Sequence, residues 1–112
     1  MRHTDTKMLR ILCQLYRAHG IMRFSLRQAH VALCPKRPPA WLGAGDAERV
    51  KGYLVPLVKS GLVIEREGPR GGEGWAVSVL GAFKADQYAL TQHPHFQVAY
   101  FRDRKKAWSQ HA

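Results

Sequence analysis

The chain has 112 residues, a length typical of one domain with a single modest core. It carries 18 lysine and arginine residues against 8 aspartate and glutamate residues, a formal net charge of +10. Such a charge attracts polyanions and disfavours basic protein partners, but it does not distinguish nucleic acid from an anionic membrane surface. No apolar run approaches the about 20 residues that cross a bilayer, and residues 1–10 lack the apolar centre of a signal peptide. We therefore expect no membrane partner and a cytoplasmic location.

The two cysteines, Cys13 and Cys34, are too few for a disulfide framework or a cysteine-based metal cluster. We interpret each as a small apolar residue, with a disulfide between them as the alternative. A reducing compartment agrees with the missing signal peptide.

The first predicted helix covers residues 4–20. Its apolar residues recur at spacings of three and four: Met8, Ile11, Leu12, Leu15 and Tyr16. Gly20 supplies the left-handed conformation that ends many helices. A very short strand is expected at 21–24.

The second predicted helix begins with a capping box, in which Ser25 and Gln28 satisfy each other's backbone N–H groups. Its candidate apolar positions are Leu26, Ala29, Val31 and Leu33. The helix ends before a proline- and glycine-rich loop at 35–45, in which Trp41 is expected to fold back over the core.

The third predicted helix, 46–60, has Asp46 as its N-cap and ends at Gly61. One face is apolar at helical spacing: Val50, Tyr53, Leu54, Leu57 and Val58. Pro56 lacks the N–H that would bond the carbonyl of Gly52. Because a glycine bends easily, we expect a kinked helix, with two short helices as the alternative.

Beyond Gly61, the segments 62–67 and 75–80 are rich in β-branched and aromatic residues and are separated by the glycine-rich loop 68–74. This pattern predicts a β-hairpin. Helical segments are expected on both sides of Pro94.

The predicted order is helix, short strand, two helices and a hairpin, and it resembles the winged helix-turn-helix superfamily. The segments that carry the resemblance are "SLRQAHVAL" and "AERVKGYLVPLVKSGLVIERE". In particular, "LVKSGLVIERE" is similar to the point where the recognition helix ends at a glycine and the wing begins. Two features depart from the superfamily pattern: the long loop between the second and third helices, and Pro56.

The resemblance covers about residues 5–80 and implies an α+β, mostly helical fold. A winged helix-turn-helix domain, a three-helix core plus a β-hairpin wing, would occupy residues 1–81. A C-terminal helical extension would follow at 82–112.

The resemblance also implies a function, a small transcriptional regulator that binds double-stranded DNA. Helix 46–60 would lie in the major groove, and the 68–74 wing would contact the backbone or the minor groove. By position, four residues would face the groove: Glu48, Arg49, Gly52 and Val55. Lys51 and Lys59 would lie nearer the DNA backbone.

Three further residues are candidate contacts to phosphate. Arg70 lies in the wing, where flanking glycines allow a close backbone approach, and an ordinary solvated turn is the alternative. Ser25 and Arg27 lie at the start of the second helix, whose N–H groups attract anions. The capping box alone would also explain Ser25.

Catalysis and metal binding are not expected. His93 and His95 are the closest histidine pair, and neither a cysteine nor clustered carboxylates accompany them. No spacing suggests a nucleophile with a base and an orienting residue. We therefore predict neither a cofactor nor an enzyme activity.

Two interaction hypotheses remain open. The alternative to DNA binding is a phage- or plasmid-like adaptor that binds a protein or RNA through Val55, Pro56 and Trp41. Residues 82–112 combine aromatic and basic side chains and are a candidate homodimer contact. A nucleic-acid tail and a membrane-surface helix are the alternatives for that segment.

Overall fold

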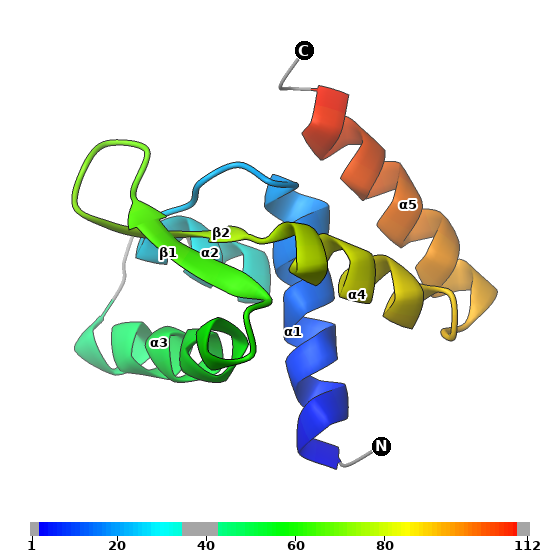
Figure 1. Cartoon of the computed structure of the whole chain (residues 1–112), viewed down its shortest axis with the longest axis horizontal. Helices are drawn as coiled ribbons and strands as arrows, with labels where there is room; N and C mark the ends of the chain where they lie inside the picture. Colours follow the sequence, from blue (N-terminus) through cyan, green and yellow to red (C-terminus); the bar gives the residue numbers. More distant parts are fainter. Residues whose placement is uncertain (1–2, 35–42, 110–112) are drawn as a thin grey trace.

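A computed structural model describes residues 3–34 and 43–109 of the chain, so Trp41 lies outside the described residues. Within these ranges the protein forms helices and one two-stranded antiparallel sheet, an α+β and mostly helical fold (Figure 1). The elements in chain order are α1 (His3–His19), α2 (Leu26–Leu33), α3 (Ala44–Lys59), β1 (Val63–Glu67), β2 (Glu73–Val77), α4 (Val79–Ala89) and α5 (Pro94–Ser109).

Helix α1 is the centre of the molecule. In Figure 1, α2, α3 and the hairpin lie to one side of it, and α5 with most of α4 lies to the other. Its fully buried residues Leu12, Cys13 and Leu15 belong to one core cluster that takes in Leu54 of α3 and Tyr100 of α5. The C-terminal helices therefore share one core with the first three. The predicted boundary at 81–82 falls inside α4.

The predicted capping box of α2 is confirmed. Ser25 Oγ accepts from Gln28 N at 3.2 Å, and Gln28 Oε1 accepts from Ser25 N at 2.9 Å. The assignment of Val31 to the core is wrong, since 40% of it is exposed while His30 is buried. The helix therefore turns His30, rather than Val31, toward the neighbouring elements.

Helix α3 begins two residues earlier than expected. Gly43 occupies the N-cap without a side-chain hydrogen bond, so the prediction of Asp46 as N-cap is wrong. Asp46 lies in the first turn instead, where its negative charge still favours the positive end of the helix. The helix continues through Pro56, so the alternative of two short helices is also wrong. Gly61 has a φ of 74° and follows the helix as predicted.

The hairpin pairs β1 with β2, in a register that runs from Val63↔Val77 to Glu67↔Glu73. The strand expected at 21–24 is reduced to a bridge between Phe24 and Trp75, whose N–O distances are 2.7 and 3.0 Å. Because Phe24 directly precedes the N-cap of α2, this bridge holds the start of α2 against the hairpin.

The second strand ends earlier than predicted, because Ser78 caps α4. The Ser78 hydroxyl accepts a hydrogen bond from Gly81 N at 2.9 Å and donates one to Gly61 O at 2.6 Å. Val79 and Leu80, expected in a strand, therefore belong to the first turn of α4.

Polar contacts and aromatic packing attach α5 to the rest of the molecule. Arg17 pairs with Asp103 at 2.6 Å, and the Tyr100 hydroxyl donates to Asp86 Oδ1 at 2.8 Å. Phe96 and Phe101 pack against the core. The described aromatic residues of α5 thus face inward, and Arg102, Lys105 and Lys106 are exposed, whereas Arg104 is partly buried and pairs with Asp86 at 3.3 Å.

Candidate nucleic-acid interface

All six residues predicted on α3 are exposed: Glu48, Arg49, Lys51, Gly52, Val55 and Lys59. We call these six residues the α3 face. The opposite side of the helix buries Val50, Leu54 and Leu57 in the core. The helix is therefore amphipathic in the sense predicted, and its polar side is accessible to a partner.

The α3 face has two flanks. Residues two positions apart project about 200° apart on a helix, so Arg49 and Lys51 lie on opposite flanks. Tyr53 is one turn after Arg49, and the Nζ atom of Lys7 in α1 lies 5.2 Å from the centre of the Tyr53 ring. Lys51 reaches Glu73 of the hairpin at 3.2 Å. Arg49 thus lies on the α1 side of the face, and Lys51 lies on the hairpin side.

The ion pair between Lys51 and Glu73 was missed by sequence reasoning, which placed Lys51 near the DNA backbone. Glu73 also stands directly opposite Glu67 in the strand register. Two like charges in that position repel each other, and Lys51 offsets the repulsion. Both partners are about half exposed, so the pair contributes little to stability, but it lowers the positive charge of this flank.

A cleft of about 370 Å³ lies where the hairpin turn meets the start of α2. We call it the hairpin cleft, and it is lined by Ser25, Arg27, Gln28, Pro69, Arg70 and Gly71. The structure thus brings together three of the predicted site residues from two separate elements. Arg27 and Arg70 are both exposed and place two positive charges at the cleft, and the Glu67 carboxylate lies near Gly71 on the same turn.

The turn that carries Arg70 depends on its glycines. Gly71 and Gly72 have φ values of 86° and 72°, a region that favours glycine. A Cβ on Gly68 would lie 2.9 Å from the carbonyl oxygen of Glu73. Arg23 supports the same turn by donating from Nη1 to Glu67 O at 3.5 Å. These contacts hold Arg70 beside α2.

Ser25 has a structural role in this cleft. Its hydroxyl accepts from Gln28 N and its own N–H donates to the Gln28 side chain, so both groups serve the capping box. The positive end of α2 and the arginine side chains therefore account for any attraction to phosphate.

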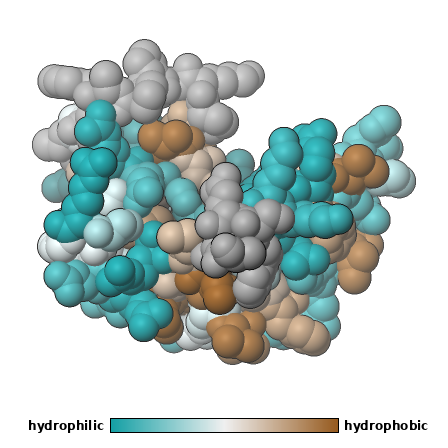
Figure 2. Space-filling model, turned by 90° about the horizontal axis from the view of Figure 1, so that it is seen from above, coloured by the Kyte–Doolittle hydropathy of each residue, from teal (hydrophilic) through white to brown (hydrophobic). Residues whose placement is uncertain are grey.

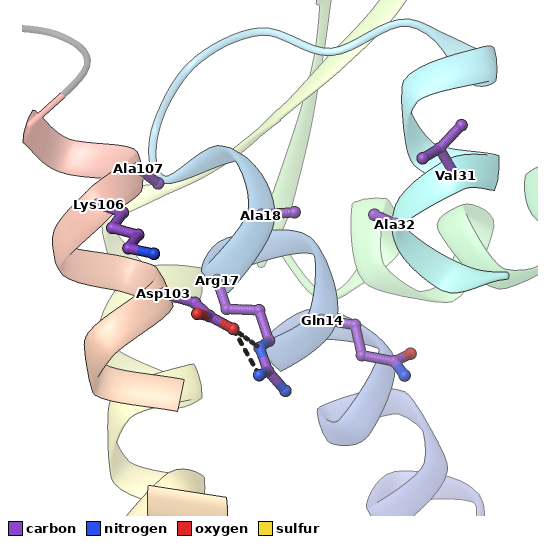
Figure 3. Close-up of a pocket in the computed structure, with 8 residues that line it drawn as sticks. All are labelled: Gln14, Arg17, Ala18, Val31, Ala32, Asp103, Lys106 and Ala107. Atoms are coloured by element: carbon purple, nitrogen blue, oxygen red, sulfur yellow. Dashed lines mark hydrogen bonds and ion pairs between the residues drawn. The ribbon is translucent and has the colours of Figure 1, made fainter. Parts of the chain in front are cut away.

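The predicted histidine pair and a second cleft involve other residues than the α3 face and the hairpin cleft. The rings of His93 and His95 stack at 4.9 Å, and the described ranges contain no group of three or more residues that could hold a metal ion. A cleft of about 470 Å³ between α1, α2 and α5 is crossed by the Arg17–Asp103 ion pair, with Lys106 beside it (Figure 3). Among 3–34 and 43–109, no helix is both long and apolar enough to span a membrane.

The cysteines are both free, so the disulfide alternative is wrong. Burial, with a smaller effect of Asp86, raises the pKa of the Cys13 thiol to about 12, and the thiol donates to Ala85 O. A thiol in that state is a poor nucleophile. Cys13 therefore acts as a core residue.

Comparisons with known protein families, with curated proteins and with solved structures found no significant match. The interpretation of this surface accordingly depends on its own residues and geometry.

Proposed function

We propose that this protein is a winged helix-turn-helix regulator that binds duplex DNA in the cytoplasm. It would use the α3 face and the hairpin cleft together. The observation that carries the proposal is the cleft itself, where Arg27 and Arg70 come from separate elements to the same opening. The order of helices, the Phe24–Trp75 bridge and the hairpin also agree with the resemblance.

The two surfaces adjoin, since Lys51 on the α3 face contacts Glu73, only two residues after Gly71 of the cleft. If α3 lies in the major groove of a duplex, phosphates of that duplex would therefore lie close to the hairpin turn. The major groove is about 12 Å wide, close to the diameter of a helix with its side chains. The two flanks of α3 would then face the phosphate backbones on the two sides of the groove.

This geometry changes two of the predicted roles on α3, because Arg49 was expected to face the base edges and Lys59 to lie nearer the DNA backbone. Gly52 and Lys59 project almost directly away from the buried side, so they would approach the base edges most closely. Arg49 would face the phosphate backbone on one side of the groove, and Lys51 would face the backbone on the other side. Glu48 and Val55 project about 30° and about 50° from that direction, between the two flanks, so they would also face the base edges.

A salt titration with fluorescence anisotropy tests the proposal. Random genomic duplexes and the promoter region of its own gene serve as probes. A specific regulator keeps one fragment bound at a salt concentration that releases the others. Each phosphate contact contributes about −0.9 to the slope of log K against log salt, so the variant Arg27→Glu with Arg70→Glu should lose about 2 units of slope.

Arg102→Glu is the control, because Arg102 is an exposed arginine on α5, and α5 lies across α1 from α3 in Figure 1. It makes the same charge change per residue and should leave the preference between fragments intact. If the control weakens binding as much per charge as the double variant, net charge alone explains the attraction. The interface proposed here would then be rejected.

A second candidate function is the protein- or RNA-binding adaptor. It is favoured by Val55, of which 49% is exposed, next to the exposed Pro56 on α3. The third residue predicted for this contact, Trp41, lies outside the described residues. Val55→Ser should weaken an apolar protein contact strongly and duplex binding only slightly. Pull-down of one partner that Val55→Ser loses, without any DNA preference in the wild type, would establish the adaptor instead.

A further inference from the structure

A cleft of about 590 Å³ lies between the N-terminal half of α1 and the C-terminal half of α4. It is larger than the hairpin cleft, and its volume is in the range that holds small ligands. It lies toward the lower end of α1 in Figure 1, whereas Figure 2 shows the opposite, upper face, where hydrophilic and hydrophobic residues are interspersed. Most of α4 lies across α1 from α3, so an occupant would leave the α3 face accessible.

Both charged side chains that line this cleft are positive. Arg10 comes from α1 and Lys84 from α4, and both are exposed. Neither forms an ion pair within the part of the chain that the structure describes. Asp86 of α4 is held elsewhere, by the Tyr100 hydroxyl at 2.8 Å, and the exposed Asp5 of α1 is not among the lining residues. The cleft therefore offers two uncompensated cations to an anion.

A buried tyrosine adds a hydrogen-bond donor. Tyr88 lines the cleft, and only 8% of it is exposed. Its hydroxyl has no hydrogen-bond partner among the described residues, and the oxygen is not enclosed by protein atoms. A tyrosine hydroxyl on a buried ring usually has a partner, as Tyr100 has in Asp86. The Tyr88 hydroxyl is therefore a fixed polar group that is open to an occupant of the cleft.

The rest of the lining combines apolar and amide groups. Leu9 packs against the core and forms an apolar wall, and Gln87 is exposed beside it in the cleft. Thr91 Oγ1 donates to Tyr88 O at 2.7 Å. This bond satisfies a carbonyl at the negative end of α4 that would otherwise repel an anion. Such a lining suits a ring that carries polar substituents.

We propose that this cleft binds a phosphate monoester of a small ring-bearing molecule, either a sugar phosphate or a nucleotide. A phosphate monoester carries a charge of about −1.5 to −2 at pH 7, which two cations match better than they match a monocarboxylate. Arg10 can donate two parallel hydrogen bonds to phosphate, and Lys84 adds a second charge. The Tyr88 hydroxyl donates to an oxygen of the ligand, and the ring lies against Leu9. This site shares no residue with the α3 face or the hairpin cleft.

Isothermal titration calorimetry of the whole chain without DNA tests the site, with AMP and glucose 6-phosphate as probes. A salt concentration of about 0.15 M screens attraction to scattered surface charges. At least one probe should bind at a single site, more tightly than inorganic phosphate, while adenosine and glucose should not bind. Arg10→Gln with Lys84→Gln should lower the affinity at least about ten-fold, because hydrogen bonds to a charged group are strong.

Tyr88→Phe separates a ligand contact from a structural role. It keeps the buried ring and removes only a hydroxyl that has no partner among the described residues. The melting temperature should therefore stay that of the wild type, while the affinity for the bound probe falls several-fold.

Arg102→Gln with Lys106→Gln is the matched control, because it removes one arginine and one lysine from exposed positions on α5. It should bind the probe like the wild type. The proposal is overturned if neither probe binds more tightly than inorganic phosphate, or if adenosine or glucose binds as well as its phosphate. It is also overturned if the control loses as much affinity as the Arg10 and Lys84 variant, or if Tyr88→Phe binds like the wild type. Since no DNA is present, failure here leaves the proposed function untouched.

Discussion

Replacing Gly81 with alanine should detach the start of α4 from the hairpin. A Cβ at this position would overlap the carbonyl oxygen of Leu62 and would lie 2.9 Å from its carbonyl carbon. The Val77 Cγ1 atom would be 3.0 Å away. That same oxygen accepts a hydrogen bond from Ser78 N at 3.0 Å, so its movement would disturb the cap of α4. The helix therefore has little room to adjust.

The magnitude follows from three contributions. Overpacking costs typically about 1–3 kcal/mol. Weakening the capping hydrogen bonds adds about 1 kcal/mol, and the better helix propensity of alanine returns up to about 1 kcal/mol. With the full propensity gain, the expected net loss in free energy of unfolding is about 1–3 kcal/mol. At about 4 °C per kcal/mol for a chain of this length, the melting temperature should fall by roughly 4–12 °C.

Gly52→Ala is the matched control, because Gly52 is also a helical glycine and no atom lies within 4 Å of its Cβ position. It should raise the free energy of unfolding by up to about 1 kcal/mol. Thermal and urea unfolding followed by circular dichroism measure both variants. If Gly81→Ala melts with the wild type, α4 does not approach Leu62 as closely as the structure shows, and the reasoning fails.

Three further predictions concern charge and chemistry. Glu73→Gln removes the partner of Lys51, so it should tighten duplex binding several-fold at low salt in an anisotropy titration, and unchanged or weaker binding would argue against contact on this flank. In a thiol titration of the native protein Cys13 should stay unreacted until urea is added, because it is buried and its pKa is about 12; rapid reaction of both Cys13 and Cys34 would contradict this. Burial lowers the pKa of His19 below its ordinary 6.5, so unfolded protein binds the proton more readily. The contribution of His19 to stability should therefore be fully present above pH 6.5 and decline below it, and urea midpoints of wild type and His19→Gln should converge as the pH falls.

Local sequence determined the elements whose stabilising contacts lie within a few residues. The capping box of Ser25 and Gln28 and the stop at Gly61 were predictable because each depends on backbone geometry nearby. The apolar faces of α1 and α3 followed from spacing alone, since a buried stripe repeats with the helical period. Strand boundaries were less predictable, because β-branched residues such as Val79 also fit a helix once Ser78 caps it.

Only the tertiary structure decided which of the predicted residues act together. Arg27 and Arg70 are 43 positions apart, and the Phe24–Trp75 bridge brings them to one cleft. The pairing of Lys51 with Glu73 depends on how α3 packs against the hairpin. Composition therefore established the positive charge of the chain, and the spacing of its apolar residues established the amphipathic helices. Long-range packing set where that charge is concentrated, because a cleft or an ion pair requires groups that the chain brings together only when it folds.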